Sequence, residues 1–282
     1  MKLVRFGAPG GEKPGLIDAD GTIRDLSEIV DDIAGLVLDD TTLDMIRDID
    51  PSTLPAVDAD TRLGPCVGDI GKFLCIGLNY SDHAAETGAA IPEHPILFFK
   101  ANSAIVGAND TVIMPRGSTH TDWEVELGVV IGKTCKYVKK EDALDVVAGY
   151  CVVNDVSERH FQTQLTGQWT KGKSCDTYGP TGPYLVTRDE IPDPQNLDMW
   201  CDVNGERRQT GNTSTMIFTV AEIIEHLSSL FTLEPGDVIS TGTPPGVGMG
   251  MKPEPVYLKV GDKMDVWIDG LGQQTQMVAM DE

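Results

Sequence analysis

Beyond residue 72 the chain breaks into short apolar runs separated by glycine and proline, and this segmentation constrains the fold more than any other feature. Only two stretches, 81–87 and 220–230, have the spacing and flanking residues of a helix. Short strands joined by Gly and Pro turns are typical of mostly β domains. We therefore expect a mostly β fold with strands at 73–77, 96–100, 124–131, 149–153, 199–203, 238–241, 256–260 and 263–268.

The first 66 residues have a different pattern, with short strand candidates at 3–6, 15–18 and 22–24 and a few short helical runs. The run Asp18-Ala19-Asp20-Gly21 joins two of these strands, since Asp and Gly tolerate the left-handed backbone of a tight hairpin. We expect a small N-terminal α+β domain over 1–66 and a mostly β domain over 67–282.

The chain carries a large acidic surplus, since 22 Lys and Arg stand against 44 Asp and Glu, a formal charge of −22. Proteins that bind nucleic acid or anionic membranes need a basic surface, so we expect no nucleic acid and no membrane among the partners. The N-terminus lacks an apolar signal core, and no apolar run approaches the roughly 20 residues of a membrane span. We therefore expect a folded cytoplasmic protein.

The run Asp122-Trp123-Glu124-Val125-Glu126 alternates between acidic and apolar residues. On a strand its three carboxylates share one face and the apolar residues share the other. This pattern fits a half-exposed strand with a polar outer face. It also fits a site in which Glu124 and Glu126 bind a hard divalent cation such as Mg²⁺, and a third carboxylate would favour that interpretation.

Asp155 is a candidate for the third carboxylate, because it follows the end of the apolar run 151–153. It could instead be a helix N-cap, which is the commoner role of such an aspartate. If the segment after it turns helical, Arg159 and Gln162 project from the same side at i+4 and i+7. They would then place a cation and an amide beside the carboxylate, as an anionic ligand requires.

His83 and Glu86 lie three residues apart in the expected helix 81–87, so they share one face. The simplest interpretation is a surface ion pair. A carboxylate beside an imidazole also raises its basicity, as a water-activating general base requires. The zinc-protease pattern H-E-x-x-H is absent from the chain.

Two loops rich in Gly and Pro carry further candidates. Lys173 precedes the segment 174–183, whose Gly and Pro content argues against regular structure. The segment 240–250 has neither the P-loop lysine nor a following helix, so it is not a nucleotide site. Its backbone N–H groups and the Thr243 hydroxyl could receive a carboxylate, or the segment could be a plain hairpin connection.

Together and in this order, the motifs resemble the fumarylacetoacetate hydrolase family over about residues 70 to 270. The stretches that carry the resemblance are GLNY at 77–80 with His83 and Glu86, DWEVEL at 122–127, ND at 154–155 with Arg159 and Gln162, KS at 173–174, VNGERRQ at 203–209, GNTS at 211–214 and PGDVISTGTP at 235–244. The sequence departs from the family pattern at Cys175, where an aromatic residue is expected.

The resemblance implies a catalytic domain of the mixed β-roll or β-sandwich type beside the small α+β domain, in a homodimer. It implies Mg²⁺ or Mn²⁺ as cofactor and a 2-oxo or 2,4-dioxo acid as substrate. The residues at the family's functional positions are the metal ligands Glu124, Glu126 and Asp155, the catalytic residues His83, Glu86 and Lys173, and the substrate-binding residues Arg159, Gln162, Thr243 and Tyr80.

On this basis we expect a metal-dependent hydrolase that cleaves a C–C bond of a 2,4-dioxo acid and releases pyruvate. A water activated by His83 and Glu86 would attack the C4 carbonyl, and the C3–C4 bond would break. The chain resembles bacterial members that act on 2,4-diketo-3-deoxy-L-rhamnonate or -fuconate, and others labelled ureidoglycolate lyase. An isomerase or decarboxylase on the same scaffold is an alternative, and a non-catalytic metal or oxo-acid binding protein is an alternative of another class.

Overall fold

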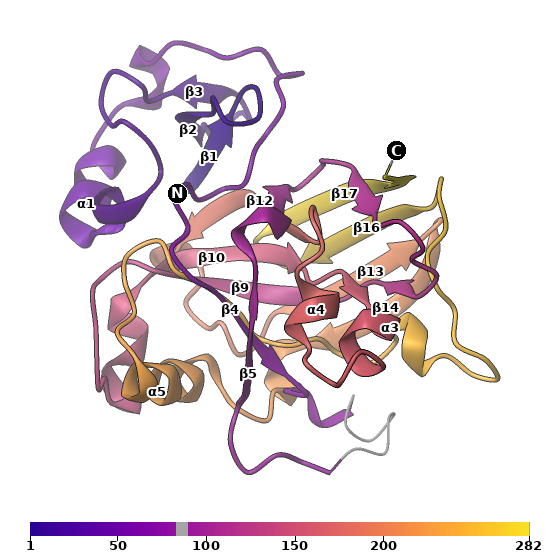
Figure 1. The fold of residues 1–282 in the computed structure, drawn as a ribbon. Helices are drawn as coiled ribbons and strands as arrows, with labels where there is room; N and C mark the ends of the chain where they lie inside the picture. The colour runs from indigo at the N-terminus through magenta and orange to yellow at the C-terminus, as the bar shows by residue number, and fades with distance from the viewer. Residues whose placement is uncertain (83–89, 282) are drawn as a thin grey trace.

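The computed structural model describes residues 1–82 and 90–281, and its chain is mostly β (Figure 1). Its strands are β1 (Lys2–Phe6), β2 (Lys13–Ile17), β3 (Ile23–Asp25), β4 (Phe73–Gly77), β5 (Ile96–Lys100), β6 (Ile105–Gly107), β7 (Val112–Met114), β8 (Thr121–Asp122), β9 (Val125–Ile131), β10 (Val147–Asn154), β11 (Ser157–Glu158), β12 (Gly179–Thr187), β13 (Asp198–Val203), β14 (Glu206–Asn212), β15 (Val238–Ser240), β16 (Lys263–Ile268) and β17 (Gly272–Met280). The described helices are α1 (Asp40–Arg47), α3 (Arg159–Thr163), α4 (Thr170–Lys173) and α5 (Val220–Leu230), with 3-10 turns at Gly35–Leu38, Pro51–Thr53, Asn102–Ala104, Lys140–Val146, Arg188–Glu190, Thr213–Thr215 and Gly248–Gly250.

Two sheets dominate the architecture. The larger has ten strands, nine of them in the order β3-β2-β1-β12-β10-β9-β15-β4-β5, and the tenth, β6, lies beside β12. The smaller has five strands in the order β14-β13-β16-β17-β7, and β11 pairs with β8 in a short ribbon. Figure 1 shows the five-stranded sheet beside the central strands of the larger one.

The central strand β9 is buried on both faces, and successive side chains enter different cores. Val129 belongs to the core that the two sheets share, together with Val266 of β16 and Leu227 of α5. Val130 belongs to a second core on the opposite face of the large sheet, which Ile46 of α1 helps to fill. A strand covered on both faces gives a fixed platform for side chains at its ends.

The N-terminal residues continue the large sheet rather than standing apart from it. Strand β1 pairs antiparallel with β12, so that Leu3 lies opposite Leu185. Helix α1 begins where the Asp39 carboxylate accepts a hydrogen bond from the backbone N–H of Thr42. Because the sheet runs through the junction, the domain boundary at residue 66 stays a prediction.

The expectation of irregular structure over 174–183 is wrong for its second half, because β12 begins at Gly179 and lies between β1 and β10 in the sheet. The register between β10 and β12 shifts between Tyr150 and Val152, and this irregularity lies next to Gly182. At Gly179 a Cβ would lie 2.9 Å from the Phe73 ring, so close packing favours glycine there. Tertiary packing therefore overrides the local preference.

The strand expected at 256–260 is also wrong. This segment makes single backbone hydrogen bonds to two different parts of the chain. Val256 N donates to the Gly248 carbonyl at 2.9 Å, and Leu258 N donates to the Thr121 carbonyl at 2.8 Å, so no strand ladder forms. Strand β14 was not expected, because it has no apolar residue, and β17 was not expected, because its first five residues are glycine or polar. No described helix has the length and apolar character needed to cross a bilayer.

Candidate metal centre and active site

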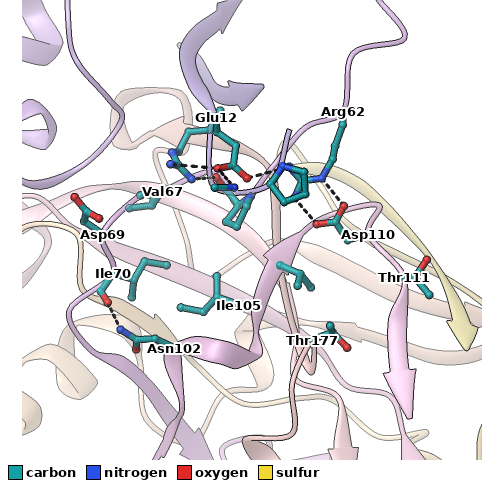
Figure 2. Close-up of a pocket in the computed structure, with 16 residues that line it drawn as sticks. Glu12, Arg62, Val67, Asp69, Ile70, Asn102, Ile105, Asp110, Thr111 and Thr177 are labelled. Carbon is teal, nitrogen blue, oxygen red and sulfur yellow. Dashed lines mark hydrogen bonds and ion pairs between the residues drawn. The ribbon is translucent and has the colours of Figure 1, made fainter. Parts of the chain in front are cut away.

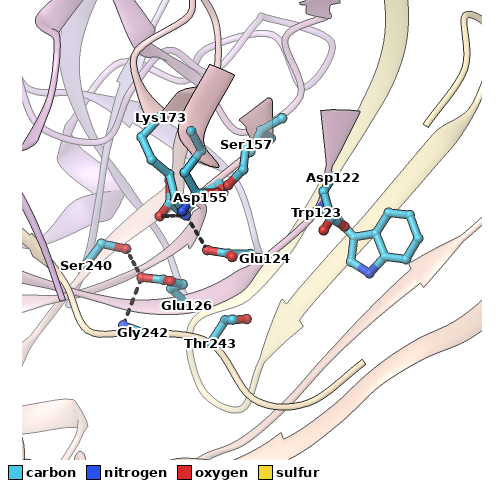
Figure 3. A network of polar contacts seen from close by, with 12 residues as sticks. Asp122, Trp123, Glu124, Glu126, Asp155, Ser157, Lys173, Ser240, Gly242 and Thr243 are labelled. Carbon is cyan, nitrogen blue, oxygen red and sulfur yellow. Dashed lines mark hydrogen bonds and ion pairs between the residues drawn. The ribbon is translucent and has the colours of Figure 1, made fainter. Parts of the chain in front are cut away.

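Three carboxylates converge where β9 and β10 lie side by side (Figure 3). Glu126 lies opposite Val153 in the antiparallel pair, and the backbone N–H of Asp155 donates to the Glu124 carbonyl at 2.9 Å. One oxygen from each of Glu124, Glu126 and Asp155 lies within 4.8 Å of the others, and all three residues are buried. Glu124 and Glu126 therefore point into the protein, and the interpretation of this run as a strand with a polar outer face is wrong.

Glu126 is held by neutral donors. Its carboxylate accepts hydrogen bonds from the Ser240 hydroxyl and from the backbone N–H of Gly242 at 2.9 Å (Figure 3). Gly242 has a φ of +99°, a conformation that favours glycine. Burial, and then the charges of Asp155 and Glu124, raise the pKa of Glu126 well above its usual range.

Glu124 lies between two cations. Lys173 Nζ and Arg159 Nη2 each donate to its carboxylate at 2.7 Å. Burial alone would raise the pKa of Glu124, but the charges of Lys173 and Arg159 outweigh it and hold the pKa well below its usual range. Lys173 also donates to Asp155 Oδ2 at 2.6 Å, so one lysine bridges two of the three carboxylates.

Lys100 is a site residue that the sequence reasoning missed. Its side chain is fully buried at the end of β5, and its Nζ donates to Asp155 Oδ1 and to the Val156 carbonyl at 3.0 Å. A signal was available, because Lys100 shares the face of an apolar strand with Phe98 and therefore needs a buried partner.

Arg159 is positioned by Asp122, the first carboxylate of the alternating run. Asp122 is fully buried and accepts hydrogen bonds from Arg159 Nε at 2.8 Å, from Gly248 N at 2.6 Å and from Met249 N at 2.9 Å. This arrangement places a guanidinium between Asp122 and Glu124.

The segment after Asp155 becomes helical only at Arg159, and the Glu158 side chain caps α3. Asp155 is therefore not the N-cap, and Arg159 and Gln162 share a side because they lie three residues apart. Arg159 Nη1 donates to Gln162 Oε1 at 3.1 Å. The expected grouping is present, although it does not arise from one helix that includes Asp155.

A cavity of about 180 Å³ opens beside the carboxylates. Polar groups of Glu124, Glu126, Arg159, Gln162, Lys173 and Thr243 line it, together with apolar walls from Phe98, Trp169, Val247 and Met249. Thr243 is held there by donating to the Val125 carbonyl at 2.9 Å and accepting from Gln209 Nε2 at 2.8 Å.

Tyr80 and Cys175 are not among the residues that line this cavity. Tyr80 is fully buried in the core that the two sheets share, and its hydroxyl lies 3.2 Å from Met199 Sδ. The charge of Glu126 contributes, after burial, to the raised pKa of Tyr80, and the role of Tyr80 as a substrate-binding residue stays a prediction. An aromatic ring is nevertheless present beside the polar groups, because Lys173 Nζ lies 5.1 Å from the centre of the Phe98 ring.

His83 and Glu86, the expected catalytic pair, lie outside the described residues.

A larger hollow of about 500 Å³ lies between the N-terminal residues and the rest of the chain (Figure 2). Its charged groups bind one another, since Arg62 contacts Glu12 at 2.9 Å and Asp110 at 2.6 Å. Arg5 likewise pairs with Asp32 at 2.6 Å. The smaller cavity is the better candidate for an active site, because it lies beside three buried carboxylates, two of which have strongly shifted pKa values.

Comparison with known proteins gives a consistent assignment. Residues 72–279 match the family described as the fumarylacetoacetate (FAA) hydrolase C-terminal domain. A Burkholderia multivorans protein provisionally named a hydrolase is 62% identical over 277 residues, which make up 98% of each chain.

Two solved structures are similar over the whole chain. One is 2-hydroxyhepta-2,4-diene-1,7-dioate isomerase from Mycobacterium marinum, 33% identical with a TM-score of 0.76, covering 100% of this chain and 99% of that one. The other is maleylpyruvate hydrolase from Sphingobium in complex with manganese(II) and pyruvate, 29% identical with a TM-score of 0.83, covering 100% of both chains.

The sequence motifs, the β-rich fold and these similarities agree with one another. The matched domain spans most of the chain and includes all three carboxylates. The buried acidic cluster, together with the manganese ion in the related hydrolase, points to a divalent metal. The chain belongs to the fumarylacetoacetate hydrolase family.

Proposed function

We propose that this protein is a metal-dependent hydrolase that cleaves the C3–C4 bond of a 2,4-dioxo acid and releases pyruvate. The observation that carries the proposal is the group of three buried carboxylates within 4.8 Å beside a cavity lined by Lys173 and Arg159. The related hydrolase in complex with manganese(II) and pyruvate supports the same reading.

The residues present fit a hard divalent cation. Glu124, Glu126 and Asp155 would hold Mg²⁺ or Mn²⁺, since such ions take carboxylate oxygens and are bound through a few of them. When bound, the ion supplies Lewis-acid stabilisation of negative charge on the substrate's oxygens. The four carboxylates at the site, these three and Asp122, face three cations, so an added dication makes the site net positive for an anionic substrate.

The chain's own residues would bind and orient the substrate. Arg159, Gln162 and Thr243 would bind its carboxylate end, because their polar groups line the cavity. Lys173 would donate to the oxygen on which charge develops as the C3–C4 bond breaks, an effect worth on the order of 3 kcal/mol for a well-placed donor. Phe98 and Val247 would exclude bulk water from this step.

His83 and Glu86 complete the proposal as the pair that takes the proton from the attacking water. A homodimer in the cytoplasm, and a substrate of the 2,4-diketo-3-deoxy sugar acid type, belong to the same proposal. An isomerase is the second candidate, because a related structure of similar fold carries that name.

Pyruvate release from an acylpyruvate, measured with and without a chelator, tests the function. We expect activity to disappear with the metal and return when Mn²⁺ or Mg²⁺ is added. His83→Ala should abolish pyruvate release while Mn²⁺ affinity stays near that of the unchanged protein.

The matched control is His226→Ala, because His226 lies outside the cavity and stacks on His94 at 6.0 Å. Chelator-insensitive turnover would exclude the metal mechanism. Isomerisation without pyruvate release would favour the second candidate, and metal-dependent pyruvate binding without turnover of any dioxo acid would identify a binding protein.

A further inference from the structure

Two of the sequence motifs, VNGERRQ at 203–209 and GNTS at 211–214, have no role in the proposed function. Both reach onto β14, an edge strand of the five-stranded sheet, and neither supplies a residue to the described lining of the cavity. Gln209, the last residue of the first motif, is nevertheless fully buried. A buried amide needs hydrogen-bond partners inside the protein, so its contacts show what the motif does.

The Gln209 amide joins strand β9 to the loop that follows β15. Its Oε1 accepts the backbone N–H of Val125 at 2.9 Å. Its Nε2 donates to the Pro244 carbonyl at 2.9 Å and to Thr243 Oγ1 at 2.8 Å. The backbone partners fix which end of the amide is which, because an N–H needs an acceptor and a carbonyl needs a donor. One side chain from the five-stranded sheet therefore holds two separate segments of the site together.

The two segments that Gln209 joins carry groups of the candidate active site. Val125 directly precedes Glu126, and Thr243 directly follows Gly242, whose backbone N–H donates to the Glu126 carboxylate at 2.9 Å. The Thr243 hydroxyl donates to the Val125 carbonyl at 2.9 Å, so both backbone groups of Val125 are bonded within this cluster. A shift of the loop would therefore move the donor to Glu126 and the Thr243 side chain together.

Two glycines let this loop lie directly on β14, within reach of the Gln209 amide. A Cβ at Gly211, the first residue of the second motif, would lie 2.4 Å from Pro244 Cβ. A Cβ at Gly246 would lie 2.0 Å from the carbonyl oxygen of Arg208, and Gly246 has a φ of +103°. Only glycine allows such close approaches, so both motifs serve the same contact between β14 and the loop.

We propose that Gln209 is a positioning residue of the active site, which sets the affinity for the metal and for the substrate without touching either. It acts through the loop 242–244, by fixing where Gly242 and Thr243 stand relative to the strand that carries Glu126. Partners that orient metal-binding carboxylates commonly change metal affinity by about 10- to 100-fold. The part that concerns substrate rests on the proposed function, whereas the part that concerns the metal rests on the three carboxylates alone.

Gln209→Met tests the proposal, because it keeps the length of the side chain and removes the amide. Calorimetric titration of the metal-free protein with Mn²⁺ should show a Kd raised about tenfold or more. The KM for acetylpyruvate should rise by a similar factor. At saturating Mn²⁺ and substrate, kcat should stay within about twofold of the unchanged protein, because α4 rather than this loop places Lys173.

Gln274→Met is the matched control. Gln274 is also a fully buried glutamine on an edge-to-core position of the same sheet, and its Nε2 donates to the Val152 carbonyl at 2.8 Å and to the Gly182 carbonyl at 3.0 Å. It makes no hydrogen bond to the loop 242–244 among those of the described residues. The control should lower the urea midpoint as Gln209→Met does, with the Kd for Mn²⁺ and the KM unchanged.

Gln209→Asn is the second variant, and it carries the test if Gln209→Met does not fold. It keeps the amide on a shorter side chain that can bond only one of the two segments, so Kd and KM should rise less than in Gln209→Met.

An unchanged Kd for Mn²⁺ in the folded variants, or an equal rise in Gln274→Met, would overturn the positioning role. A rise in Kd without a rise in KM overturns the substrate part alone. If the unchanged protein releases no pyruvate while Gln209→Met still weakens Mn²⁺ binding, the proposed function fails and the role of Gln209 at the metal stands.

Discussion

At the scale of single residues, the site depends on ion pairs that are removed from water. Lys100 and Lys173 share Asp155, and Glu124 takes one contact from Lys173 and one from Arg159. A buried charge is tolerated only when a partner of opposite charge compensates it. Each of these side chains is therefore held in place by the others before any ligand binds.

Lys100→Met should lower the free energy of unfolding by about 3–5 kcal/mol, because it leaves Asp155 as a buried charge with one partner fewer. The measurement is urea unfolding of the metal-free protein. Lys133→Met is the matched control, since Lys133 contacts Asp40 at 2.6 Å with both side chains 40% exposed. The control should lose about 1 kcal/mol or less, and equal losses would contradict the role given to burial.

The raised pKa of Glu126 predicts that metal binding releases a proton. In the metal-free protein Glu126 keeps its proton above the usual carboxyl pKa of about 4.3, whereas a metal ion requires the carboxylate. Mn²⁺ affinity should therefore rise with pH between that usual value and the raised one. Calorimetric titration with Mn²⁺ at one pH, in buffers that differ in ionisation enthalpy, measures the number of protons released on binding.

Glu126→Gln should abolish that proton release and weaken Mn²⁺ binding, whereas Glu206→Gln at the surface should change neither. Binding of Mn²⁺ without any proton release would show that Glu126 is already ionised.

At the scale of elements, short helices place the cations by packing closely on one another. Helix α4 ends in Lys173, and α3 carries Arg159 and Gln162. Figure 1 shows α3 and α4 next to each other beside the sheets. A Cβ at Gly172 would lie 2.3 Å from the Glu158 carbonyl oxygen and 2.5 Å from Gln162 N, so only glycine allows this approach.

Gly172→Ala should push α4 away from α3 and withdraw Lys173 from Glu124 and Asp155. We expect a loss of about 1–3 kcal/mol in stability and a fall of more than about tenfold in kcat/KM. Steady-state kinetics and urea unfolding measure the two effects. Gly11→Ala is the control, because the nearest atom to a Cβ there is 3.8 Å away. Full activity of Gly172→Ala would show that α4 can shift without cost.

The elements also show where sequence reasoning succeeds. The expected ranges 73–77, 96–100, 220–230 and 263–268 agree with β4, β5, α5 and β16 to the residue, because each is an apolar or amphipathic run between clear breakers. Strand β12 was missed because its Gly and Pro residues are tolerated only through its neighbours in the sheet.

At the scale of the whole molecule, the net charge of −22 opposes the approach of an anionic substrate. With the proposed metal bound, Arg159, Lys173 and the ion would reverse the sign of the field locally at the cavity. We expect kcat/KM for a dioxo acid to rise severalfold as ionic strength increases from about 10 to about 150 mM, because salt screens the long-range repulsion. Kinetics at saturating Mn²⁺ measure this, and kcat, which does not include the approach step, should stay constant. A fall in kcat/KM with salt would instead show that the cavity's own cations steer the substrate.

The mostly β class, the family and the residues that could bind a metal can be predicted from the amino-acid sequence, because alternation along 122–126 and each of the motifs lie within short stretches of the chain. It left open whether Glu124 and Glu126 face water or the interior, since either face of a strand can be buried. The packing of the sheets answers this question, because it covers β9 on both faces and brings Asp155 beside Glu124 across the β9–β10 pair. The same packing places Lys100 in contact with Asp155, which lies 55 residues away in the sequence, and buries Tyr80 in the core that the two sheets share. Such contacts join distant segments: the local pattern shows that Lys100 needs a buried partner, but it does not show which residue that partner is.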